Sequence, residues 1–250
     1  MKNNKKPSVN LVIDVGNTRV KAAVFEEDKL LSLFVFDKKR ILTEVRKILK
    51  NFTIHAGIIS SVASISDFKL QKLKQIFPFT VVSSKTKVSF HNKYSTPNTL
   101  GVDRIALIVA AQKQFPQKNV LVIDAGTCLT FDFIQSNSDY LGGAISPGMQ
   151  MRFEALHKFT AKLPLITAEI PTDFIGNSTN QSMCSGVVNG VLNEIEGAIS
   201  LYKKKYSDLT VVLTGGDTNF LLKQLKSSIF ANQNFLLSGL NEILIFNKSK

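Results

Sequence analysis

The chain lacks the sequence features of membrane, secreted and disulfide-stabilised proteins. Its longest unbroken apolar run, 105–111, is far shorter than the roughly 20 residues of a membrane-spanning helix. The N-terminal segment MKNNKKPSVN is positively charged but has no apolar stretch, so we expect no secretory signal. Cys128 and Cys184 are the only cysteines, lie far apart and form no CxxC motif, which is typical of a reducing compartment. These absences predict a cytoplasmic protein with no membrane partner.

The sequence also has no Trp and only three histidines, His55, His91 and His157. The histidines show no ligand spacing, so we do not expect a zinc site. No helix-turn-helix, zinc-finger or RNA-binding motif is present, and the sequence contains no low-complexity segment. We therefore expect no nucleic acid partner, although Lys and Arg number 31 against 19 Asp and Glu and give a net charge of +12. The lysines are scattered, and such a charge favours anions in general.

What the chain has is enough apolar matter for a sizeable core: 44% of its 250 residues are hydrophobic and 20% are charged. This composition excludes wholesale disorder, and the length suggests two domains or one large one. Two segments resemble each other, because each begins with LVID-x-G, at Leu11 and Leu121, and continues into an alternating apolar run. An apolar run, an Asp-x-Gly turn and an alternating run are typical of a β-hairpin. The repeat predicts two domains of similar topology, 1–116 and 117–250.

The remaining apolar patterns alternate between helix and strand, which predicts an α/β fold. Helical spacing covers 40–50, 67–76, 103–115, 148–163 and 186–202, and strand patterns cover 54–62, 79–82 and 211–213. The cations of Lys203–Lys205 predict the end of the last of these helices, where they meet the negative end of the helix dipole.

Both predicted hairpin turns carry residues that can bind phosphate: Asp14-Val15-Gly16-Asn17-Thr18-Arg19 and Asp124-Ala125-Gly126-Thr127. Exposed N–H groups in such a turn can hold a phosphate, and the carboxylate can hold hydrated Mg²⁺. Either turn alone is typical of an ordinary hairpin. Two matching loops across a cleft would hold a polyphosphate from both sides.

A third glycine turn, Thr214-Gly215-Gly216-Asp217, follows the strand pattern 211–213. Glycines there would let a flat base lie against the backbone. The order and spacing of the three turns are similar to those of the superfamily of actin, hexokinase and sugar kinases, and chaperone ATPases. The resemblance implies an α/β fold of two ribonuclease-H-like (actin-like ATPase) domains with a central cleft.

Asp103 is the candidate catalytic residue. It follows Gly101 and Val102, precedes Arg104 and lies at the predicted start of a helix. Asp is a routine cap at that position, but phosphoryl transfer to an alcohol needs a carboxylate that orients and deprotonates the hydroxyl. Arg104 could bind a carboxylate through its planar fork. Thr179 is open to two interpretations, a helix cap or a substrate contact.

Together these segments closely resemble type III pantothenate kinases, the Bvg accessory factor family, over nearly the whole chain. The shared motifs are D-x-G-N-T at Asp14–Thr18, Y…G-x-D-R at Tyr94 and Gly101–Arg104, D-A-G-T at Asp124–Thr127, G-G-x-I-x-P-G at Gly142–Gly148, T-A-x-L-P at Thr160–Pro164 and T-G-G at Thr214–Gly216. The chain departs from the family at Cys128, where a small residue such as Ala is usual.

The resemblance implies ATP-dependent phosphorylation of pantothenate to 4'-phosphopantothenate, the first step of coenzyme A biosynthesis. It implies a homodimer whose active sites are completed at the subunit interface, near the helix predicted at 148–163. Asp103 would be the general base, Asp14 would serve Mg²⁺, and Asp124 would hold K⁺ or NH₄⁺. The implied pantothenate contacts are Tyr94, Gly101, Val102, Arg104 and Thr179, and the implied ATP contacts are Asp14, Val15, Gly16, Asn17, Thr18, Arg19, Val20, Lys21 and Thr127.

Three alternatives stay open. Another sugar or acid kinase could use the same fold, because a fold does not fix a function, but Tyr94 with Gly101–Arg104 matches the pantothenate pattern. A nucleic acid-binding regulator is disfavoured by the scattered charge. A catalytically inactive relative is disfavoured because Asp14, Asp103 and Asp124 are all present.

Overall fold

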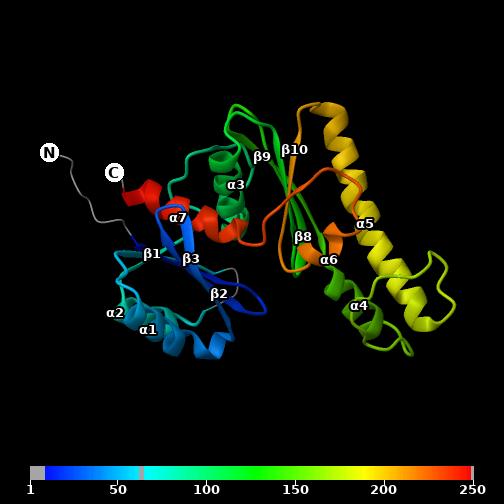
Figure 1. Ribbon diagram of the computed structural model, residues 1–250, viewed down its shortest axis with the longest axis horizontal. Helices are drawn as coiled ribbons and strands as arrows, with labels where there is room; N and C mark the ends of the chain where they lie inside the picture. Colours follow the sequence, from blue (N-terminus) through cyan, green and yellow to red (C-terminus); the bar gives the residue numbers. More distant parts are fainter. Residues whose placement is uncertain (1–8, 62–64, 249–250) are drawn as a thin grey trace. The chain divides into compact units, whose positions relative to one another are not determined.

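The computed structural model describes residues 9–61 and 65–248, and the chain divides into two compact units. The first unit contains the residues through Gln114 together with those from Phe235 onward, and the second is Phe115–Asn234. Each unit contains a β-sheet with helices packed on it (Figure 1). The N-terminal segment examined for a secretory signal falls largely in 1–8, which lies outside the described residues, as does Val62, the predicted end of a strand.

The first unit is built on a five-stranded sheet in the order β3-β2-β1-β4-β5. Its strands are β1 (Val9–Val15), β2 (Val20–Glu26), β3 (Lys29–Phe36), β4 (Ala56–Ser61) and β5 (Phe79–Val81). The first predicted hairpin is confirmed, since β1 pairs antiparallel with β2. Strand β4 pairs parallel with β1 and with β5. The carboxyl ends of β1 and β4 therefore lie side by side.

Helices cover both faces of this sheet (Figure 1). The longer elements are α1 (Ile41–Asn51), α2 (Asp67–Ile76), α3 (Val102–Gln114) and α7 (Phe235–Lys248); β6 (His91–Asn92) and the 3-10 helices Lys38–Arg40 and Pro97–Thr99 are short. Apolar residues of α1 and α2 pack against Leu11 and Ile13 of β1. The alternate residue Asn10 faces α7, so α7 covers the opposite face of β1.

Helix α7 differs from the division predicted from sequence, which placed it with the second domain. It groups with the first unit because it is bonded into the β1–β2 hairpin. The Asn241 side chain accepts a bond from Asn10 Nδ2 at 2.8 Å and donates to Glu27 O at 2.7 Å. A Cβ at Gly239 would overlap Ala106 O, so a glycine at this position lets α7 approach α3 closely.

The second unit contains the other predicted hairpin, and its strands run in the order β11-β10-β7-β8-β9. Its elements are β7 (Val120–Ala125), β8 (Cys128–Ile134), β9 (Asp139–Pro147), α4 (Met149–Lys158), α5 (Thr179–Lys205), β10 (Thr210–Thr214), α6 (Thr218–Leu222) and β11 (Phe230–Ala231). Strands β7 and β8 are antiparallel, and β10 is parallel to β7. Helix α5 runs along this sheet (Figure 1), where Val188 and Ile195 pack with Leu121 and Ile123.

Two helices of this unit differ in length from their sequence patterns. Helix α5 ends at Lys205 as predicted but begins at Thr179, because the Ser178 side chain caps it by accepting a bond from Gln181 N at 3.3 Å. Helix α4 stops at Lys158 instead of continuing to 163, and Thr160 Oγ1 donates to Leu156 O at 2.7 Å just beyond its end. None of the helices within 9–61 and 65–248 is long and apolar enough to cross a membrane.

Candidate active site

The carboxylate of Asp14 lies at the end of β1, just before an exposed polar turn. Parallel pairing of β1 with β4 places Ser60 opposite Asp14, and Ser60 Oγ donates to Asp14 Oδ1 at 2.7 Å. Gly16 N donates to Arg19 O at 3.1 Å and closes the turn. The side chains of Asn17, Thr18 and Arg19 are exposed. The turn therefore presents exposed polar groups close in sequence to a carboxylate that Ser60 holds in place.

Asp14 is half-buried, and desolvation of its carboxylate raises its pKa to about 6. The Ser60 hydrogen bond lowers this pKa, repulsion from Asp103 raises it, and Lys21, its partner across the hairpin, lowers it. A cation next to Asp14 would favour the ionised form. Within the described ranges no group of three His, Cys, Asp or Glu side chains could hold a metal. A Mg²⁺ ion here would take its other ligands from phosphate and water, as Mg²⁺ commonly does.

Asp103 lies in the first turn of α3, as the sequence predicts. Its Oδ1 accepts a bond from the backbone N–H of Arg104 at 2.8 Å. A side chain at Gly101 would overlap this same oxygen, so the glycine leaves room for the carboxylate. Because Asp103 contributes to the raised pKa of Asp14, the two carboxylates act on each other within the first unit.

Arg104 and Tyr94 lie together beside this helix start. The Arg104 side chain is buried, and its guanidinium carbon lies 5.6 Å from the centroid of the half-buried Tyr94 ring. A guanidinium at this distance from an aromatic face is held by a cation–π interaction. The first unit thus brings together a carboxylate pair, an arginine and a phenol.

The second phosphate-type loop follows β7 in the second unit. Gly126 N donates to Cys128 O at 3.0 Å and closes the turn, leaving Thr127 exposed. The loop after β9 packs on this turn, since Gly148 N donates to Thr127 O at 3.1 Å. A Cβ at Gly148 would overlap Gly126 O and Thr127 O, so only glycine allows this approach.

The third glycine turn packs on the same loop from the other side. Strand β10 lies parallel to β7 with Thr214 opposite Asp124, and Asp217 N donates to Ala125 O at 3.0 Å. Gly215 has a φ of +99°, and a Cβ there would overlap Ala125 O and the Asp124 carboxylate. Burial raises the pKa of Asp217. Three motifs that are far apart in the sequence therefore meet at the carboxyl end of β7.

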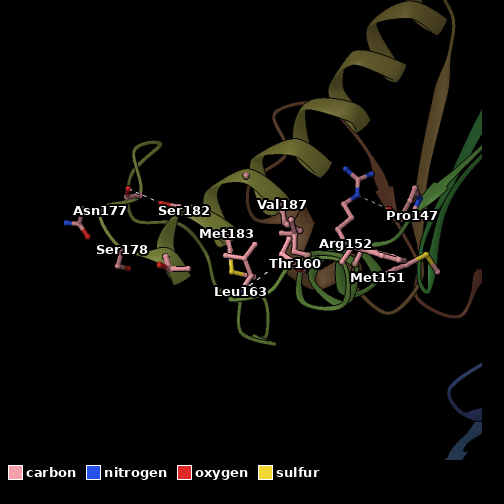
Figure 2. Close-up of a pocket in the computed structure, with 16 residues that line it drawn as sticks. Pro147, Met151, Arg152, Thr160, Leu163, Asn177, Ser178, Ser182, Met183 and Val187 are labelled. Atoms are coloured by element: carbon pink, nitrogen blue, oxygen red, sulfur yellow. Dashed lines mark hydrogen bonds between the residues drawn. The ribbon is translucent and has the colours of Figure 1, made fainter.

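An apolar groove of about 1380 Å³ lies between α4, the start of α5 and the segments that join them (Figure 2). Leu156, Phe159, Met183 and Val187 are among the apolar side chains that line it. Thr179 also lines the groove and is exposed. Because Ser178 is the cap of α5, the capping alternative for Thr179 is wrong.

The predicted site residues are distributed over both units. The residues from Asp14 to Lys21, Tyr94 and Gly101–Arg104 lie in the first unit, whereas Asp124, Thr127 and Thr179 lie in the second. Sequence patterns did not indicate Ser60, which bonds Asp14, or Arg152, which holds the segment before Gly148. Ser60 could have been found only by pairing the strand pattern at 54–62 with β1.

Comparisons with known proteins agree with these features. Residues 10–201 match the sequence profile described as type III pantothenate kinase. A type III pantothenate kinase of Christiangramia forsetii is 49% identical over 243 residues, which cover 97% of this chain and 100% of that protein. One of Flavobacterium johnsoniae is also 49% identical, over 235 residues, which cover 93% and 96% of the two chains.

The solved structures support the predicted architecture. A ROK family glucokinase from Streptomyces griseus, in complex with glucose and AMPPNP, has a TM-score of 0.55 at 12% identity and covers 97% of this chain and 100% of its own. This likeness confirms the two-domain ribonuclease-H-like fold. Since the profile match and both relatives agree, the chain belongs to the type III pantothenate kinase family.

Proposed function

We propose that the protein transfers the γ-phosphoryl group of ATP to the terminal hydroxyl of pantothenate and forms 4'-phosphopantothenate, the first step of coenzyme A biosynthesis. The names of the relatives support this substrate. The observation that carries the proposal is the arrangement around Asp103, whose carboxylate is fixed by Arg104 N and accommodated by Gly101. Because such a kinase consumes ATP, we place it in the cytoplasm.

In this proposal Asp103 is the general base. Its Oδ1 is bonded to Arg104 N. Its other oxygen would accept the proton of the substrate hydroxyl as the hydroxyl oxygen attacks the γ-phosphorus, while the bond from this phosphorus to the β-phosphate oxygen breaks and ADP leaves. The Arg104 guanidinium and the Tyr94 ring would bind the polar end of pantothenate, with Gly101 and Val102 supplying backbone contacts. The cation–π contact between Arg104 and Tyr94 supports this role, because it limits the freedom of both side chains before the substrate binds.

ATP phosphates would contact the Asp14–Lys21 segment and Thr127. Asp14 would hold Mg²⁺ together with phosphate oxygens, and Asp124 would hold K⁺ or NH₄⁺. The raised pKa of Asp14 supports this, because desolvation disfavours the charged carboxylate and a bound cation would offset that cost. Bound cations would neutralise charge on the transferred phosphoryl group. The exposed N–H and hydroxyl groups of both turns would orient the phosphates.

We further propose a homodimer in which a second copy of the chain covers the apolar groove of the second unit. Phe159, which lines the groove, is 80% exposed, and large exposed apolar surfaces usually mark interfaces. Thr179 lies on the groove and would contact pantothenate in the assembled dimer.

A coupled assay of ATP consumption tests the proposal, with purified protein, MgATP, KCl and pantothenate. We expect Asp103→Asn to lower kcat by about 10²- to 10⁴-fold, the range for loss of a general base, with the KM for ATP changed less than twofold. Asp67→Asn is the matched control, because Asp67 also lies in the first turn of a helix. A K⁺-free, NH₄⁺-free buffer should abolish activity. If the wild type consumes no ATP with pantothenate in any monovalent cation, the substrate assignment is wrong.

A further inference from the structure

Arg152 of α4 donates hydrogen bonds to three groups on other elements. Its Nε donates to Pro147 O at 2.9 Å, and Nη2 donates to Ser146 Oγ at 3.0 Å. Nη2 also forms an ion pair with Glu194 of α5. Only 22% of the Arg152 side chain is exposed. Figure 2 shows this side chain extending from α4 toward Pro147 at one end of the groove.

The segment that Arg152 holds is the one that supports the Asp124–Thr127 loop. Ser146 and Pro147 end β9 and lead directly into Gly148, whose N–H bonds Thr127 O at 3.1 Å. Arg152 N donates in turn to Gly148 O at 3.1 Å. The guanidinium therefore holds the backbone carbonyl of Pro147 and the side chain of Ser146, the two residues that directly precede the glycine bonded to Thr127.

Through its ion pair with Glu194, Arg152 is attached to helix α5, which is itself held by the core of the second unit. This helix is 27 residues long, and its residues Val188, Val191 and Ile195 are buried in the core of the second unit. Gly190 lies one turn before Glu194, and a Cβ placed on it would be 3.8 Å from Arg152 Nη1. The guanidinium therefore lies close against this face of α5.

We propose that Arg152 is a positioning residue for nucleotide binding: it ties segment 146–148 to α5 and so fixes the loop that presents Thr127 to ATP. The inference rests on the proposed function, in which Thr127 contacts ATP. Arginine suits this role because its planar fork can bond a carbonyl, a hydroxyl and a carboxylate at once, whereas lysine is a single point charge.

The test uses the full-length protein and two readouts, calorimetric binding of MgATP and steady-state kinetics. We expect Arg152→Met to weaken MgATP binding and raise the KM for ATP about tenfold, the size expected for losing a hydrogen bond from a charged group. Arg152→Lys should recover only part of the loss. The KM for pantothenate should change less than twofold. Arg40→Met is the control, because Arg40 forms an exposed ion pair with Glu44 in the first unit.

The outcomes separate positioning from general stability. A purely structural role would lower the Tm and the active fraction while leaving the KM and Kd for ATP unchanged, and this result would overturn the inference. If Arg152→Met does not fold, the KM and Kd of Arg152→Lys for ATP decide between the positioning role and the purely structural role. A wild type that binds MgATP without phosphorylating pantothenate would refute the proposed substrate, and the MgATP affinities would still decide the role of Arg152. A wild type that binds no MgATP overturns both.

Discussion

The charge of Asp14 destabilises the nucleotide-free protein, so removing that charge should stabilise the fold. Burial is the main cause of its pKa of about 6, against an ordinary value of 3.8. At pH 8 this difference corresponds to about 3 kcal/mol, since one pKa unit is worth about 1.36 kcal/mol. The native state binds the proton more tightly than the unfolded chain does. The unfolding free energy therefore falls as the pH rises from about 4 to about 6, and it stays lowered above that range.

Asp14→Asn removes the charge and keeps an oxygen that can accept the Ser60 hydrogen bond. We expect its unfolding free energy at pH 8 to exceed that of the wild type by about 1–2 kcal/mol, because desolvation of the new amide offsets part of the gain. The Tm should rise by about 2–8 °C. At pH 4 the variant should instead be less stable than the wild type by about 0.5–1.5 kcal/mol, since the native wild-type carboxyl is then protonated and the desolvation cost of the amide remains. The same variant should lose Mg²⁺-dependent activity.

Urea denaturation of EDTA-treated, nucleotide-free protein at both pH values measures these differences. Asp28→Asn is the matched control, because this carboxylate is 67% exposed and its ion pair with Lys113 is long, at 3.6 Å. Such exposed pairs contribute little, so the control should change stability by less than about 0.5 kcal/mol. Equal stabilisation by Asp14→Asn at both pH values would exclude its charge as the cause. A loss of stability at pH 8 would refute the claim that desolvation of the Asp14 charge dominates at this site.

Two further variants test the second unit. Gly215→Ala should lower the unfolding free energy by at least about 2 kcal/mol, because alanine is strained at a φ of +99° and its Cβ would overlap the Asp124 loop. Gly216→Ala is the control, since a Cβ there meets open space, and it should change the unfolding free energy by about 1 kcal/mol or less. Equal losses for the two variants in urea denaturation would contradict this packing. Phe159→Glu should convert the proposed dimer to monomer in analytical ultracentrifugation, whereas Phe174→Glu, on a phenylalanine equally exposed but outside the groove, should not. A dimer that survives Phe159→Glu would place the interface elsewhere.

The local sequence pattern predicted those helices and strands whose two faces differ in polarity. Both hairpins were predictable, because each pairs an apolar run with an alternating run across a glycine turn. Helix α1 shows Ile41, Val45 and Ile48 on one face. Helix α7 escaped prediction because its buried residues, from Phe235 to Leu244, leave no polar face to set a period. Its place in the first unit depends on Asn241 and Gly239, whose partners are remote in the chain.

Prediction of the candidate site from the sequence has the same limit, because partners that are remote in the chain cannot be read from local motifs. Asp14, Asp103 and Asp124 could be proposed from motifs, because each lies next to glycines that mark a turn. Ser60 and Arg152 could not, since each acts on a residue or loop through pairing of strands or crossing of helices. The first turns of α5 also went unpredicted, because their sequence is polar and shows no apolar period; the structure shows that the helix begins after the cap at Ser178.

The discontinuous first unit sets an order of events on the ribosome. Residues 115–234 form a continuous unit that can fold as soon as they emerge, whereas the first unit waits for α7. Until then the face of β1 that carries Asn10 has no cover, although β1 was among the first strands to be synthesised. The middle of the nascent chain can therefore fold before the two ends, which complete the first unit together. The strand that carries Asp14 is among the first to be made and among the last to be completed.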